Sequence, residues 1–185
     1  ARVVTLTRAG AVGAVGATYH TPAAAHPDYP AVEVLNQVLA EDGTGRLYEA
    51  LVKSKKAAQV FGVSFNWKDP GVLVALAQVD PDKIEDVRQT LIETLENLGK
   101  KPITAEEVER AKRQLLVERE KTLANSQQFA VGLSNWAGAG DWRLFFLHRD
   151  RLEKVTAADV NRAAEKYLLS SNRTVGVFQP TKAPA

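Results

Sequence analysis

Two hydrophobic periodicities divide the chain, and their order is the feature that most constrains the fold. Alternation with a period of two, typical of strands, occurs at residues 2–8 and 12–20 near the start and at 173–178 near the end. The alternating run 61–67 and the apolar run 72–79 flank the turn-forming stretch 66–71, which predicts a hairpin. Hairpin connections therefore outnumber crossover connections, and this favours a largely antiparallel sheet.

Helical spacing fills most of the rest of the chain. The sequence predicts two capping boxes at helix starts. Thr104 is followed three residues later by Glu107, and Thr156 by Asp159, each just before an apolar stripe. The predicted helices lie near residues 30–39, 44–52, 81–98, 104–123, 125–136, 144–152 and 156–168. We therefore predict an α+β fold, a mainly antiparallel sheet of about five or six strands with helices packed on one face.

Two strands carry unusual side chains. The run Val72–Ala77 is apolar at every position, which predicts a central strand covered on both faces. The second strand holds Gly13 and Gly16 among small residues, so another element is expected to pack closely over it.

Composition excludes several classes of protein. The 185 residues include 24 Lys plus Arg against 22 Asp plus Glu. Nucleic-acid binding is not predicted, because the sequence has no basic cluster accompanied by aromatic residues. A membrane span needs roughly 20 apolar residues, far more than the run Val72–Ala77 provides. The length suits one domain, 1–185. Because the chain has no Met and begins with Ala1, we expect a fragment of a longer polypeptide.

Residue types that carry hydrolytic chemistry are scarce. Cysteine is absent, which removes thiolate nucleophiles and Cys-ligated metals. His20 and His26 lie six residues apart across a Pro-containing loop, and His148 is expected at the edge of a helix, so each is interpreted as a surface or loop histidine. We predict no catalytic, cofactor-binding or metal-binding residue.

Aromatic residues gather around a Gly-broken segment late in the chain. They are Trp136, Trp142, Phe145 and Phe146. Core packing between helices is preferred over an interface for this cluster.

A run of segments resembles the pitrilysin/insulinase family of zinc peptidases, the inverzincins. The resemblance begins at Pro27-Asp28 and continues through Gly43-Thr-Gly-Arg46-Leu47-Tyr48, the Asp80-Pro81 helix and Ile103-Thr104. It extends through Gly140-Asp141-Trp142 and Val155-Thr156 to the strand that ends at Pro180, so it covers nearly the whole chain.

The resemblance implies a mitochondrial-processing-peptidase-like metallohydrolase fold. Members of this family pair such domains as two bowl-shaped halves around a chamber, and one domain carries zinc on an H-x-x-E-H motif. That motif is absent from this sequence, so the chain resembles the second, non-zinc-binding domain type. Zinc is therefore expected in another domain of the parent, and no cofactor in this fragment.

The resemblance also indicates two positions that hold substrate in family members. Domains of the second type supply an Arg and, about seven residues later, a Tyr. The alignment on Leu47–Leu51 puts Val52 and Gln59 at these positions. Valine has no hydrogen-bond donor and glutamine has no phenol, so no catalytic role is transferred to either residue.

The implied function is that of an inactive domain in a zinc metalloendopeptidase. The domain would complete one half of a substrate-enclosing chamber and support the zinc-bearing domain, in the same chain or in a partner subunit, while peptide substrates are hydrolysed. The alternative is a non-proteolytic scaffold or core subunit of a larger complex. The family implies the bacterial periplasm or cytoplasm, with the periplasm preferred.

Overall fold

The computed structural model describes residues 2–181, which form one five-stranded sheet in the order β1-β5-β2-β4-β3. The strands are β1 (Arg2–Ala9), β2 (Gly13–Thr21), β3 (Gln59–Ser64), β4 (Gly71–Val79) and β5 (Arg173–Thr181). β1 runs parallel to β5, and every other pair is antiparallel. The predicted α+β class with a mainly antiparallel sheet is confirmed.

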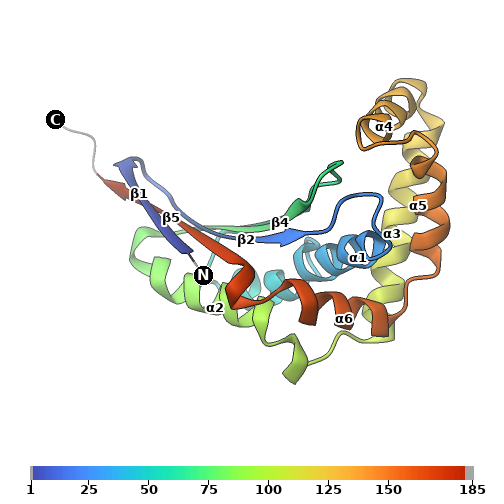
Figure 1. Ribbon diagram of the computed structural model, residues 1–185. Helices are drawn as coiled ribbons and strands as arrows, with labels where there is room; N and C mark the ends of the chain where they lie inside the picture. The colour runs from blue at the N-terminus through green and yellow to red at the C-terminus, as the bar shows by residue number, and fades with distance from the viewer. Residues whose placement is uncertain (1, 182–185) are drawn as a thin grey trace.

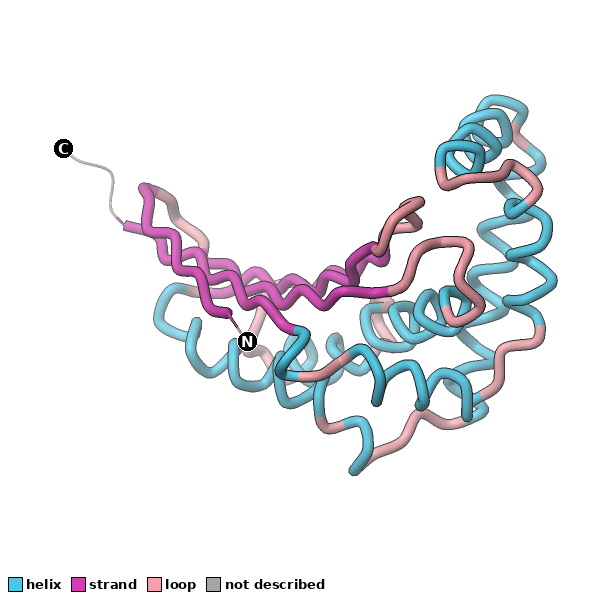
Figure 2. Tube along the Cα trace, in the orientation of Figure 1, coloured by secondary structure: helices cyan, strands magenta, loops and turns pink. Residues whose placement is uncertain are grey.

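The helices lie on one side of the sheet and beyond one end of it (Figures 1 and 2). Helices α1, α2 and α6 lie beneath the sheet, whereas α3, α4 and α5 rise beside it as an arm. Their bounds are α1 Tyr29–Ala40, α2 Ile84–Glu96, α3 Ala105–Ala124, α4 Ser126–Gly138, α5 Leu144–Glu153 and α6 Ala157–Tyr167. A π-helical turn covers Tyr48–Lys53, and short 3-10 segments cover Pro81–Lys83, Leu98–Lys100 and Ser170–Asn172.

The main core lies between the sheet and the helices beneath it. Alternate residues of β2 and β4 point into it because successive side chains of a strand face opposite sides. The apolar stripe of α1 packs against them, as its helical spacing predicts. The residues of this contact include Val15, Ala17, Tyr19, Val34, Leu35, Val38, Leu39, Leu73 and Ala75.

Glycines allow two of these helices to approach the sheet closely. A Cβ on Gly13 would lie 2.8 Å from the Cδ1 atom of Ile84 in α2, which confirms the expected close packing over β2. A Cβ on Gly62 in β3 would lie 2.2 Å from the Cβ of Ala40 in α1. At these two points the helix lies close to the strand because glycine has no side chain.

Both predicted capping boxes are present. The Thr104 hydroxyl accepts from the Glu107 amide and the Glu107 carboxylate accepts from the Thr104 amide at the start of α3. Thr156 and Asp159 make the equivalent pair of bonds at the start of α6. These are contacts within four residues, so the local sequence alone specifies them.

The structure corrects three details. The strand predicted over 61–67 ends at Ser64, because after the bond from the Phe65 amide to the Val72 carbonyl the chain turns away and leaves Trp67 half exposed. The helix predicted at 44–52 includes π geometry. β4 is central but is not covered on both faces: Leu73 and Ala75 are buried, whereas Leu76 on the opposite face is exposed.

Candidate functional site

The side of the sheet turned away from the core helices is uncovered, and we call it the open face. Strand registers place one set of alternating residues from each strand on it. Its members are Arg2, Val4, Leu6, Arg8, Ala14, Gly16, Thr18, His20, Gln59, Phe61, Val63, Val72, Val74, Leu76, Gln78, Thr174, Gly176, Phe178 and Pro180. In Figure 1 this face looks toward the space enclosed by the rising arm.

Two glycines make the centre of the open face hollow. Gly16 and Gly176 are directly paired on the neighbouring strands β2 and β5. A Cβ on Gly176 would meet nothing within 4 Å. The hollow has a volume of about 320 Å³, and Val4, Leu6, Val74, Leu76 and Phe178 are among its lining residues. Paired glycines weaken a sheet, and they often mark a place where another group approaches the backbone.

The open face contains no carboxylate. Its charged or titratable members are Arg2 and Arg8 on β1 and His20 at the end of β2. Large uncovered apolar areas of this kind are typical of surfaces that contact another molecule. The apolar residues of β4 therefore belong to two different surfaces. One set packs into the core, and the other set forms part of the open face.

The arm presents a second surface, which is uncharged. Residues 125–140, which include α4, contain no charged side chain, and most of them are exposed, with Val131 as the largest exposed apolar residue. The aromatic cluster is divided: Trp136 and Phe145 are buried, whereas Trp142 and Phe146 are half exposed. The prediction of core packing is therefore right for two of the four residues and wrong for the other two.

The two positions indicated by the resemblance lie at one pocket. Val52 on the π-helical turn and Gln59 on β3 both line a cavity of about 510 Å³. Asp42 and Tyr48, which the sequence did not indicate as pocket residues, also line it. Tyr48 precedes Val52 by four residues, a spacing that places both on one side of a helical turn. The pocket offers an amide, a phenol and a carboxylate, but no cationic side chain.

The three histidines lie on different elements. His20 is exposed at the end of β2, and His26 is exposed in the following loop, where its Nδ1 accepts from the Asp28 amide at 3.0 Å. His148 was predicted to lie at a helix edge, and this is wrong: it is only 7% exposed, packed between the rings of Tyr29 and Trp136. The buried residues of α5 are Phe145, His148 and Leu152, and their spacing of three and four places them on one side of the helix.

His148 forms a polar pair with a residue of α1. Its Nε2 lies 2.7 Å from Oε2 of Glu33. Burial, aided by the charge of Arg119, lowers the pKa of His148 to about 4. Burial raises the pKa of Glu33 to about 7, against the opposing effect of Arg119. The pair therefore combines an imidazole that tends to stay neutral with a carboxyl that tends to take up a proton, and the two groups share one proton across this contact.

Single substitutions in this pair are expected to give opposite pH dependences. In Glu33→Gln, the free energy of unfolding should fall as pH drops from 6.5 to 4, because His148 takes up a proton more readily in the unfolded chain. In His148→Gln it should rise as pH drops from 7 to 4.5, because Glu33 binds a proton more readily in the folded chain. Each slope is at most about 1.4 kcal/mol per pH unit.

Urea denaturation of both variants and the unsubstituted chain at intervals between pH 4.5 and 6.5 measures these slopes. Other groups titrate equally in both variants, so the difference between the two slopes isolates the pair. Equal slopes would show that the two pKa values are not shifted by the fold.

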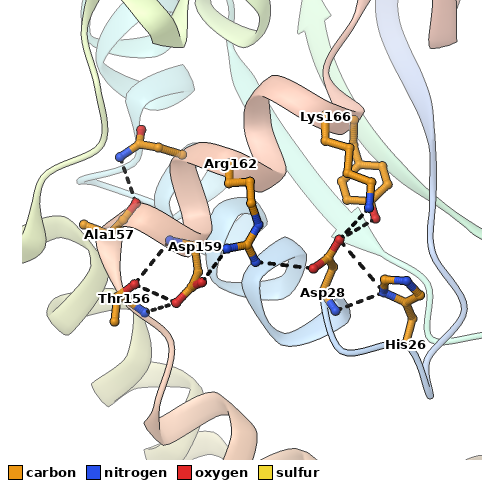
Figure 3. Close-up of polar contacts among 9 residues, drawn as sticks. His26, Asp28, Thr156, Ala157, Asp159, Arg162 and Lys166 are labelled. Atoms are coloured by element: carbon orange, nitrogen blue, oxygen red, sulfur yellow. Dashed lines mark hydrogen bonds and ion pairs between the residues drawn. The ribbon is translucent and has the colours of Figure 1, made fainter.

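A second titratable cluster surrounds Asp28 (Figure 3). Its carboxylate accepts from Lys166 Nζ at 2.8 Å and from the Tyr167 hydroxyl at 2.9 Å, both on α6, and Arg162 lies 3.4 Å away. The bond from Lys166 is the main reason that the pKa of Asp28 is lowered to about 2. The cluster holds the loop before α1 against α6, which gives the Pro27-Asp28 segment a structural role.

Two features are absent from the part of the chain that the structure describes. Within residues 2–181, no three His, Asp or Glu side chains lie close enough together to hold a metal ion. No helix in the same part of the chain is long and apolar enough to cross a membrane. The absence of catalytic residues stays a prediction.

Comparisons with known proteins agree on one family. The family model described as the peptidase M16 inactive domain matches residues 2–115. The curated zinc protease PqqE of Helicobacter pylori is 24% identical over 164 residues, which are 88% of this chain and 37% of that protein. The chain thus spans well under half the length of this curated relative.

Solved structures agree with the family match. A crystal structure from Bordetella parapertussis, described as an inactive peptidase domain, is 44% identical with a TM-score of 0.89, and the match covers 97% of both chains. A chain of complex III from Candida albicans has a TM-score of 0.82 over 95% of this chain and 45% of its own length. Because it is 15% identical, it shows similarity of fold alone.

Proposed function

Since this chain belongs to the M16 peptidase family and is an inactive domain of it, we propose that it serves a zinc metalloendopeptidase as a wall of the substrate chamber. In this proposal a zinc-bearing domain, in the same chain or in a partner subunit, hydrolyses the peptide bond. The zinc is held there and not by this chain. The preferred compartment is the bacterial periplasm.

The open face is the observation that carries the proposal. It is apolar, without carboxylates and hollow at Gly16 and Gly176, while the arm bounds the same side of the molecule. A surface of this kind suits contact with unfolded peptides or with another apolar domain. The pocket at Val52 and Gln59 has no cation to hold a substrate carbonyl or carboxylate, which favours enclosure over direct participation in catalysis.

Removal of this domain from its parent is expected to lower peptide hydrolysis about tenfold or more, because misplaced substrate lowers the rate strongly. The zinc content of the parent should not change. Both quantities can be measured on the purified proteins with an unfolded peptide as substrate. Unchanged hydrolysis would contradict the chamber role.

A finer test uses two glycines that both have open space around them. Gly176→Trp fills the hollow of the open face and is expected to reduce hydrolysis by the parent. Gly99→Trp adds the same side chain beyond the end of α2, away from the open face, and should leave hydrolysis unchanged. Equal activities of the two variants would refute a role for the open face.

The second candidate function is a scaffold in a larger complex. The chain of complex III from Candida albicans shares this fold, which favours the idea that the fold can be used for its interfaces alone. The parent sequence separates the candidates: an H-x-x-E-H motif elsewhere in it supports the peptidase, and its absence supports the scaffold.

A further inference from the structure

The first strand is the least covered element of the sheet. All eight residues of β1 are exposed, on both faces, with 55% of Val3, 45% of Val4 and 49% of Leu6 accessible. Within residues 2–181, β1 pairs with β5 alone, so the backbone groups of its other edge have no strand partner. No other described strand combines an open edge with two uncovered faces.

Most features that protect edge strands from pairing with other chains are missing from β1. Proline, lysine, inward-pointing charges and bulges keep strand edges from pairing with other chains. β1 has no Pro and no Lys, and its register with β5 runs without interruption from Arg2 to Ala9. Its only charged side chains are Arg2 and Arg8 near the two ends, so the edge between them is a ready template for another strand.

The charges on β1 are arranged symmetrically. Arg2 and Arg8 lie on the open face at the two ends, with Val4 and Leu6 between them. Six residues of extended strand separate the arginines by about 20 Å. Neither arginine forms an ion pair with a residue in the range 2–181.

The other face of β1 borders a groove that contains charges of both signs. Val3 and Thr5 line a groove of about 500 Å³ together with Asp82 and Glu85 from the segment that starts α2. Glu85 is paired with Arg88. Arg88 lines the same groove. A strand added to β1 would therefore meet two cationic side chains on one face and a groove of mixed charge on the other.

We propose that β1 binds an extended peptide segment of a partner protein as a sixth strand of the sheet. On the open face the segment carries two acidic residues six positions apart, opposite Arg2 and Arg8, with two apolar residues between them opposite Val4 and Leu6. Its backbone bonds to the free edge of β1, and its apolar side chains cover those of β1.

Charge disfavours a second copy of the chain as the occupant. When residues 2–8 of two β1 strands pair antiparallel with their open faces on the same side, Arg2 of each lies opposite Arg8 of the other, and like charges directly opposite destabilise a sheet. An acidic segment replaces these two repulsions with two attractions. The proposal needs no zinc-bearing domain and is independent of the chamber role.

The test uses the fluorescently labelled peptide Glu-Thr-Val-Thr-Val-Thr-Glu with blocked ends, and binding to the 185-residue chain is measured by anisotropy. We expect binding that weakens with salt and amide exchange that slows in residues 2–9 alone. The double variant Arg2→Glu, Arg8→Glu should bind about tenfold more weakly, and a peptide with Lys in place of both Glu should recover that affinity.

Matched controls decide the outcome. Arg113→Glu with Lys154→Glu changes the net charge equally at exposed positions away from β1 and should not affect binding. Arg2 and Arg8 are exposed, so the double variant should fold, which circular dichroism checks. Three results would overturn the proposal: slower amide exchange at β3, binding of the peptide by the double variant as tight as by the unsubstituted chain, or a dimer in ultracentrifugation that depends on β1.

Discussion

Gly62→Ala is expected to destabilise the fold by about 3 kcal/mol, the upper part of the range for overpacked cores. The new Cβ would lie 2.2 Å from the Cβ of Ala40 and 2.8 Å from Oδ1 of Asn36. The Asn36 side chain can rotate away, but Ala40 is fixed on α1, so helix and strand must separate. Urea denaturation with the slope and midpoint both fitted measures the loss.

Two controls test this explanation. Gly176→Ala makes the same change in a strand where a Cβ meets nothing within 4 Å, and it should leave stability unchanged or slightly higher. Ala40→Gly removes the atom that the new Cβ meets, so the double variant should recover part of the loss beyond additivity. A Gly62→Ala protein within 0.5 kcal/mol of the original would mean that α1 and β3 separate easily.

Arg46→Ala is expected to lower the free energy of unfolding by about 3 kcal/mol, as for other mostly buried ion pairs that lose one partner. The guanidinium donates to both carboxylate oxygens of Glu107 at 2.8 Å and to the carbonyls of Lys101 and Pro102. The substitution leaves one carboxylate and two carbonyls without these donors. Arg46→Lys should recover only part of the loss, because an ammonium cannot form the planar fork.

The same substitution should change the response to acid. The bond from Arg46 is the main reason that the pKa of Glu107 is lowered to about 2. This carboxylate therefore stabilises the fold above pH 4.5, and the stability is lost as pH falls toward 2. Arg46→Ala should show a smaller loss over that interval. The exposed pair Arg88 and Glu85 is the control, and Arg88→Ala should cost less than about 1 kcal/mol.

Contacts made within a few residues were predictable from the sequence. The capping boxes at Thr104 and Thr156 and the helical stripe of α1 each depend on local spacing, and the structure contains all of them. The fold class followed from the order of these elements. The resemblance added the family, and the comparisons confirmed it.

Contacts between distant residues were not predictable in this way. His148 is buried because Glu33, 115 residues away, and Trp136 lie around it, and no local pattern records such partners. The apolar residues of β4 suggested cover on both faces, but the sequence of one chain does not distinguish a core from a surface that meets another molecule. Asp42 likewise joins Val52 and Gln59 at their pocket only in three dimensions, whereas Tyr48, four residues before Val52, could have been found from local spacing.

The position of β5 has a consequence for how the chain reaches this structure during synthesis. The last strand lies between β1 and β2, the first two. While the ribosome is still making the chain, β1 has no neighbour in the sheet, and β2 has only β4. The sheet can therefore close only after translation has passed β5, so β1 emerges before the other described strands and is among the last of them to gain its native partner.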